Sequence, residues 1–174
     1  MELPYWLRNL PHRFRGAKQE LMRLADVGTL AQLEATVYRA DGRVEPLGVL
    51  SRRVVTTTGV NWLATAFTNV VEPEILNFHD CGTGTTAESS AQTALVTAYG
   101  GSRATGTQST PGSTNIYQSV GTISFSGSFA ITEHGIFTAA SAGVMFDRSL
   151  FSAINVASGD SIQFTWQLTL PAGG

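Results

Sequence analysis

The amino-acid sequence predicts a mainly β protein: an antiparallel, jelly-roll-like β-sandwich with an extended N-terminal arm and one or two short helices. First, apolar and polar side chains alternate strictly over residues 161–170, the period of a strand with one buried face. Second, several short apolar stretches after Pro73 are separated by Gly-containing turns such as 141–143 and 157–159. Third, only 14% of the residues are charged, and Ser, Thr and Gly take their place, which favours strands and turns.

The N-terminal part, residues 1–28, is predicted to be a docking segment that precedes a sandwich domain over residues 29–174. Pro4 and Pro11 prevent a continuous helix over the first sixteen residues, while a short helix is expected from about residue 17 to Gly28. Aromatic rings that alternate with arginines are typical of a peptide that anchors in the pockets of a partner. The alternative is that this arm folds back on its own domain. The predicted docking residues are Tyr5, Trp6, Arg8, Arg13, Phe14 and Arg15.

The next elements are a hairpin and a helix. The segments "LEATVYR" and "VEPLGVLSRRVVT" read as strands that flank a turn at residues 40–42. A Thr-capped helix is expected around Val60–Phe67, with Trp62 and Leu63 on its buried face.

Nearly all of the remaining sequence reads as strands. We expect strands in "EILNFHDCG", in the later part of "SRATGTQSTPGSTNIYQSVGTISFSG", in "SFAITEHGIFTAA", in "GVMFDRSLFSAINV" and in "DSIQFTWQLTL". Residues 93–99 are expected to form a short strand or a helix end, and a polar loop is expected around Pro111 and Gly112. The expected core residues are Phe125, Phe137, Phe151, Phe164, Trp166 and Leu168.

Charge and cysteine content restrict the classes of partner and site. Residues 1–53 hold nine of the eleven Lys and Arg against six acids, whereas residues 54–174 hold two Arg against seven acids. This weak basic excess at the front favours an acidic protein partner over nucleic acid. The lone Cys81 excludes an internal disulfide framework and a multi-cysteine zinc site. No apolar run is long enough for a membrane span, so we expect a chain made in a reducing cytoplasm with no membrane partner.

The stretch "NFHDCGTGTTAE", which begins at residue 77, raises the question of an active site. Gly82–Ala87 fits a dinucleotide-binding pattern, but no βαβ alternation surrounds it. Asp80 lies one substitution from the Asp-Thr-Gly of aspartic proteases, and Cys81 could pair with a histidine, although a lone Cys in a β-rich core is usually a small buried apolar residue. A metal site would need distant segments to meet, and its ligands would be His79, Asp80, Glu133 and His134.

We interpret the stretch instead as an ordered corner formed by Asp80, Gly82 and Gly84. Gly82 or Gly84 is expected to adopt a positive φ, which other residues rarely adopt. The segment 133–134 is expected to be an exposed turn before a strand. The sequence therefore predicts no catalytic, cofactor-binding or metal-ligating residue and no cofactor.

The C-terminal two thirds of the sequence carry a resemblance. "HDCGTGTTAESSAQTALVT", "RATGTQ" and "AITEHGIFTAASAGVMFDRSLFSAINVASGDSIQFTWQLTL" resemble virion proteins of tailed bacteriophages over roughly residues 54–170. The shorter "ITEHGIF…DR" element is also similar to β-rich tail-fibre and collar proteins.

The resemblance implies a virion component without catalytic residues. A basic, aromatic arm on a sandwich suits a capsid decoration, or cement, protein that binds the major capsid protein or another virion protein. The alternative is a tail, fibre or adaptor protein, with host binding as one role it could serve, although the repeats and stem of a fibre are missing. Surface proteins of this size commonly assemble into closed cyclic oligomers, so we expect a homo-oligomer, a trimer ahead of a dimer.

Overall fold

The computed structural model describes residues 30–52, 55–66, 76–112 and 115–170. The chain divides into two units, Met1–Gly28 with Pro171–Gly174, and Thr29–Leu170. The predicted arm, its six docking residues and the short helix expected after residue 16 lie outside the described residues. The fold below is that of the second unit.

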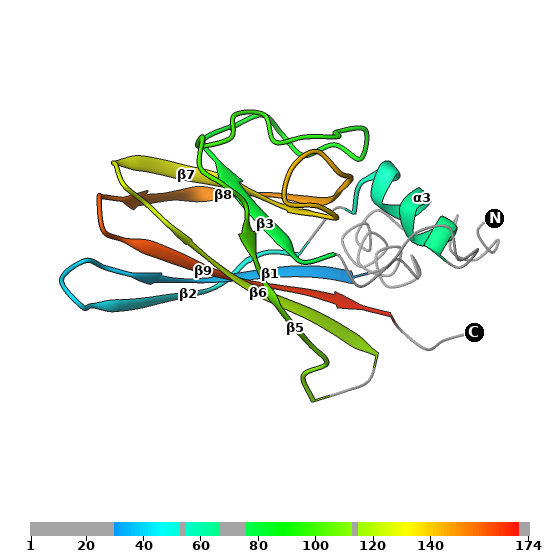
Figure 1. Cartoon of the computed structure of the whole chain (residues 1–174), viewed down its shortest axis with the longest axis horizontal. Helices are drawn as coiled ribbons and strands as arrows, with labels where there is room; N and C mark the ends of the chain where they lie inside the picture. Colours follow the sequence, from blue (N-terminus) through cyan, green and yellow to red (C-terminus); the bar gives the residue numbers. More distant parts are fainter. Residues whose placement is uncertain (1–29, 53–54, 67–75, 113–114, 171–174) are drawn as a thin grey trace, which may run out of the picture. The chain divides into compact units, whose positions relative to one another are not determined.

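Two antiparallel sheets form the second unit, and Figure 1 shows them as two layers. One sheet has the strand order β2-β1-β9-β6-β5 and the other has the order β4-β3-β7-β8. The predicted antiparallel sandwich is confirmed. The strands are β1 Leu30–Tyr38, β2 Val44–Ser51, β3 Phe78–Gly82, β4 Ala104–Thr105, β5 Thr107–Ser109, β6 Ile116–Ser124, β7 Phe129–Phe137, β8 Met145–Val156 and β9 Ser161–Thr169.

Strand β9 lies between β1 and β6, and its alternating sequence decides which face is buried. Its apolar side chains are buried at every second position, and those of β1 are buried in the same way. The rings of Phe146 on β8 and Trp166 on β9 meet edge to face at 5.7 Å, so the core fills the space between the sheets. Five of the six expected core residues are buried, and Phe151 is partly buried against the core.

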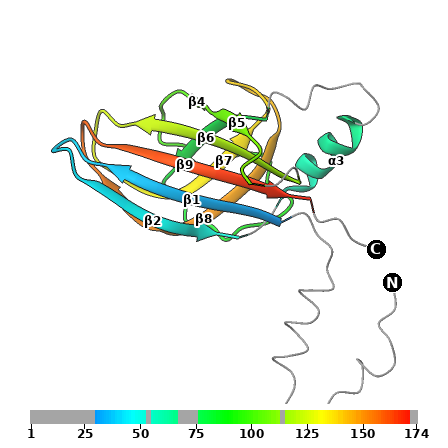
Figure 2. The same ribbon diagram turned by 90° about the horizontal axis from the view of Figure 1, so that it is seen from below.

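The predicted hairpin and capped helix are both present. The turn between β1 and β2 contains Gly42 with φ +87°, a conformation that favours glycine. Helix α3, Thr57–Ala66, begins three residues earlier than expected, and the Thr56 hydroxyl accepts a hydrogen bond of 3.0 Å from the Gly59 N–H. Trp62 of α3 packs against the Phe146 ring of β8, and Figure 2 shows the helix beyond the ends of the strands.

Two local predictions are wrong. Residues 93–99 form neither a strand nor a helix end but a loop with one bridge, from Gly82 to Ala98. Glu133 and His134 are no exposed turn: they lie inside β7, with exposed fractions of 0% and 1%. Strand β7 is buried on both faces because the loop of residues 83–103 covers the side that faces away from β9. The polar loop expected around Pro111 and Gly112 is present, and the two short strands β4 and β5 precede it.

Candidate functional site

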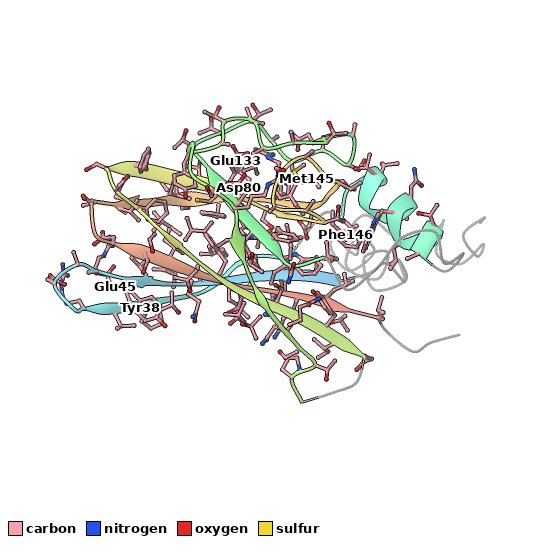
Figure 3. All side chains as sticks on the ribbon, in the orientation of Figure 1. Tyr38, Glu45, Asp80, Glu133, Met145 and Phe146 are labelled. Carbon is pink, nitrogen blue, oxygen red and sulfur yellow. The ribbon has the colours of Figure 1, made fainter. Side chains whose placement is uncertain are left out.

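The polar residues singled out in the sequence meet on two neighbouring strands, β3 and β7. Cys81 is paired with His134 and Gly82 with Glu133 in the antiparallel register. Because successive side chains of a strand point to opposite faces, the two histidines face the other sheet, whereas Asp80 and Glu133 face away from it. Figure 3 shows the positions of Asp80 and Glu133. The four proposed metal ligands are therefore divided between two faces of the sheet.

The inner cluster is a chain of hydrogen bonds inside the core. The Nδ1 atom of His79 lies 3.0 Å from Nε2 of His134, and its Nε2 atom lies 2.8 Å from the Ser119 hydroxyl oxygen on β6. Each of these residues is at most 1% exposed, and the His134 ring stacks at 4.5 Å on Phe164. Burial lowers the pKa of His79 to about 3, and burial together with the neighbouring His79 lowers the pKa of His134. Both rings are therefore neutral at neutral pH, and no substrate can reach them without opening the sandwich.

Two glycines make room for the His79 ring. A Cβ atom on Gly121 would lie 2.5 Å from His79 Cδ2, and one on Gly106 would lie 2.7 Å from His79 Nε2. No real Cβ atom tolerates such distances, so both positions require glycine while the imidazole stays in place. These glycines show that the local sequence is adapted to hold the buried ring.

The outer cluster is centred on a buried ion pair. The Arg148 Nε atom donates to a Glu133 carboxylate oxygen at 2.7 Å, and the two side chains are 1% and 0% exposed. The backbone N–H groups of Gly84, Val96 and Thr97 also donate to this carboxylate, at 3.1, 3.1 and 2.8 Å. Burial alone would raise the pKa of Glu133, but the N–H groups of Thr97 and Val96 and the Arg148 guanidinium hold it below its usual value.

The same ion pair fixes the loop of residues 83–103 to the sheet. Arg148 donates to the Thr86 carbonyl oxygen at 3.1 Å and to the Gln92 side-chain oxygen at 3.0 Å. Farther along β8, the Leu150 N–H donates to a carboxylate oxygen of Glu88 at 2.6 Å. The pair is thus the attachment point of a long loop that has little regular structure of its own.

A second arginine, Arg103, lies at the C-terminal end of the loop of residues 83–103. Its Nε atom lies 3.5 Å from an Asp80 carboxylate oxygen, and its guanidinium lies 3.5 Å from the centre of the Phe137 ring. It also donates to the carbonyl oxygens of Ala139 and Ala142, at 2.8 and 2.6 Å. Burial raises the pKa of Asp80, and the Cys81 N–H and Arg103 offset only part of this effect. Arg103 therefore bridges Asp80 of β3 and the turn after β7.

The corner after β3 is built differently from the prediction. Neither Gly82 nor Gly84 has a positive φ, so that prediction is wrong. Both glycines are needed for close approach instead: a Cβ atom on Gly82 would overlap the Thr97 carbonyl oxygen, and one on Gly84 would lie 2.5 Å from the Glu133 carboxylate. The described glycines with positive φ are Gly42, Gly48, Gly100, Gly112, Gly143 and Gly159.

The geometry does not support the chemical alternatives raised by the sequence. Cys81 is fully buried, and burial raises the pKa of its thiol, whereas a nucleophilic cysteine needs a lowered one. A loop, not a helix, follows Gly82, so the dinucleotide pattern lacks its structural context. In the described ranges, no group of three or more His, Cys, Asp or Glu side chains is placed to hold a metal ion. The two clusters hold the sheets and the loop together.

The sequence contained a signal for the outer cluster that motif analysis missed. Arg103 and Arg148 are the only basic Lys or Arg residues after residue 53. In a segment so poor in arginine, each one is a candidate partner for a buried acid. The histidine chain gave no comparable signal, because its contacts depend on the register between β3 and β7.

Comparison of the chain with family models, with curated proteins and with solved structures finds no match. The resemblance to phage virion proteins therefore stays a prediction. Among the described residues, no helix has the length and apolar character needed to cross a bilayer.

Proposed function

We propose that the chain is a non-enzymatic structural component of a tailed-phage virion, and specifically a decoration or cement protein that binds and stabilises the head shell. One observation carries the proposal. The titratable and nucleophilic side chains of segments 79–81 and 133–134 are buried. They contact protein groups that hold the sheets and the long loop together. Their arrangement supports a rigid scaffold, in which polar groups serve structure and not turnover.

The residues behind the resemblance take part in this scaffold. The element "ITEHGIF…DR" contains Glu133, His134 and Arg148, which occupy both clusters, and Asp147, whose carboxylate accepts a hydrogen bond from the Trp166 indole N–H at 3.0 Å. The residues of this element therefore stabilise the sandwich itself. Under this proposal, the residues that contact a particle lie outside this element.

The outer face of the five-stranded sheet supports a role in contact with other proteins. Along β9 this face consists of uncharged polar side chains, and among the described outward positions of β1 and β9 only Glu34 is charged. Gln167 donates to the Gln118 side-chain oxygen at 2.7 Å, and Gln118 donates to the Ser109 hydroxyl at 3.1 Å, so the polar groups are ordered across three strands. A nearly uncharged, ordered face can approach an acidic shell without repulsion.

The arm, residues 1–16, is the segment that we propose binds the particle. Its rings at Tyr5, Trp6 and Phe14 would anchor in pockets of the major capsid protein or another virion protein, and Arg8, Arg13 and Arg15 would select an acidic groove. Ordering such a segment costs on the order of 1–2 kcal/mol of backbone entropy per residue, so an arm this apolar needs a partner surface that offsets this cost.

Binding to purified particles that lack the protein tests this proposal. The full chain should bind, the Trp6→Ala/Phe14→Ala variant should bind at least about tenfold more weakly, and binding should weaken as salt rises. Val60→Ala/Val96→Ala is the matched control, because these two exposed apolar side chains lie on the sandwich domain outside the arm and should leave affinity unchanged. Failure of the full chain to bind contradicts the proposed function. If the double variant binds particles as tightly as the full chain, the particle-binding surface is a face of the sandwich and not the arm.

A further inference from the structure

The β1–β2 hairpin carries most of the exposed large apolar side chains of the described ranges. Four of seven lie there: Tyr38, Val44, Leu47 and Val49, with exposed fractions of 37%, 56%, 40% and 42%. Pro46 is exposed between them, and we call these five residues the apolar strip. Contiguous exposed apolar groups mark contact surfaces, whereas single ones are ordinary. The other three stand apart from one another in the sequence: Val60, Val96 and Leu170.

The strip does not serve to extend the sheet. Strand β2 is an edge strand, but its pairing with β1 shifts register twice, between Leu33 and Glu34 and between Ala35 and Thr36. Gly48 has φ +67°, and Pro46 has no N–H to donate. Bulges and proline on an edge strand prevent another strand from pairing with it. A partner of this edge must therefore bind through side chains.

A groove lies directly beside the strip, between the edge strands β2 and β8. It is lined by Arg39, Leu47, Val49, Leu50 and residues 151–155. Phe151 is only partly buried there. Projecting side chains and a hollow thus occupy the same edge of the sandwich. Such an edge can interlock with another copy of itself, because each copy supplies both shapes.

The tip of the hairpin carries two arginines, Arg39 and Arg43, against its own two carboxylates, Asp41 and Glu45, and Asp160 of the turn before β9 adds one negative charge. Arg39 pairs with Glu45 at 2.7 Å and with Asp160 at 3.0 Å, and Arg43 pairs with Asp41 at 2.8 Å. Figure 3 shows Glu45 beside Tyr38 on this hairpin. Because these charges nearly cancel, the edge does not attract a strongly charged partner such as nucleic acid or an anionic membrane. Two identical edges can exchange these ion pairs with little net repulsion.

We propose that the apolar strip and its groove form the surface through which copies of this chain associate with each other. The occupant is a second copy of the chain, held by apolar contacts at the strip and by the paired charges at the hairpin tip. This association does not depend on which particle the chain binds.

Sedimentation of the full chain over a range of concentrations tests the proposal. Wild type should shift from monomer to oligomer, and Val44→Lys/Val49→Lys should raise the dissociation constant by about 100-fold or more. The matched control is Val60→Lys/Val96→Lys, whose valines are 51% and 45% exposed away from the hairpin and should associate like wild type. A wild type that stays monomeric, or a strip variant that associates as tightly as wild type, overturns the proposal.

Cross-linking provides a second measurement that does not require the lysine variants to fold. Cys81 is the only cysteine and is fully buried, so a cysteine placed at Val49 or Val60 is the only accessible thiol of the described part. A bifunctional thiol reagent should join copies of Val49→Cys and leave Val60→Cys unjoined. Equal cross-linking of the two variants contradicts association through the strip.

Discussion

Two imidazole rings in the core of the sandwich have no charged partner. His79 and His134 contact each other and Ser119, and burial is the largest cause that keeps both rings neutral. Neutral histidines act here as hydrogen-bonding groups that connect β3 and β7 to β6 in the opposite sheet. Their protonation would place a charge in the core, and this predicts a specific response to pH.

We expect the free energy of unfolding to decrease as pH falls from 6.5 toward 5. The pKa of His79 is about 3 in the folded protein and about 6.5 in the unfolded chain, so only the unfolded chain binds a proton in this range. The decrease attributable to this ring approaches about 1.4 kcal/mol per pH unit. His134 acts in the same direction, whereas Asp147, whose pKa burial raises, acts in the opposite one.

Chemical denaturation at pH 7, 6 and 5 measures this response, with His79→Gln as the comparison. The variant should show a shallower dependence on pH, and the contribution of Asp147 is the same in both proteins. Equal slopes for the variant and wild type would show that His79 titrates normally in the folded protein.

The corner after β3 gives a second prediction at the scale of single residues. Gly82→Val should impair folding, because the added side chain meets the Thr97 carbonyl and the Glu133 carboxylate. Cys81→Ser should be mild, because the side chains have nearly the same size. Melting temperature and soluble yield measure both effects, and an unchanged Gly82→Val variant would refute the close-approach account.

At the scale of elements, the loop of residues 83–103 depends on one buried ion pair. Glu133→Gln removes the charge that faces Arg148 and weakens the acceptor of three backbone N–H groups. We expect a loss of about 3–5 kcal/mol in the free energy of unfolding, as for other broken buried pairs. Hydrogen exchange should become faster at the amides of Gly84, Val96 and Thr97.

The exposed pair Arg43–Asp41 is the matched control for this prediction. Its side chains are 68% and 56% exposed, so Asp41→Asn should cost less than about 1 kcal/mol and leave loop exchange unchanged. If Glu133→Gln behaves like Asp41→Asn, the ion pair does not hold the loop.

The regular elements could be predicted because their pattern is local. The alternation in β9, the turn at Gly42 and the Thr cap of α3 depend on neighbours within a few residues. The burial of Glu133 could not be predicted in this way, because it results from a loop whose residues lie 36 to 49 positions away in the sequence. A register shift between Ile131 and Glu133 also interrupts the alternation along β7, so the sequence pattern does not show which face each residue of this strand occupies.

The candidate site was predicted only in part for the same reason. The sequence identified Asp80, Gly82 and Gly84 as structural residues, but it gave the glycines a turn conformation that they do not have. Their actual requirement, space beside Thr97 and Glu133, appears only when distant segments meet.

At the scale of the whole molecule, the two sheets meet at Trp166. Its ring packs against Phe146 and Tyr117, and its indole N–H donates to the buried Asp147 carboxylate. Trp166→Ala should reduce the free energy of unfolding by about 3–5 kcal/mol, measured by chemical denaturation. A loss below about 1 kcal/mol would mean that the core is not organised around this ring.

The central claim is that this rigid sandwich is a part of a phage particle, and quantitative mass spectrometry of purified virions tests it most directly. The measurement is the ratio of this chain to the major capsid protein in particles of a tailed phage whose genome carries the gene. The account predicts a ratio on the scale of the capsid lattice, as expected for a protein that decorates the head. A few copies per particle would contradict decoration and favour the tail or adaptor alternative, and absence from purified particles would contradict the virion function itself.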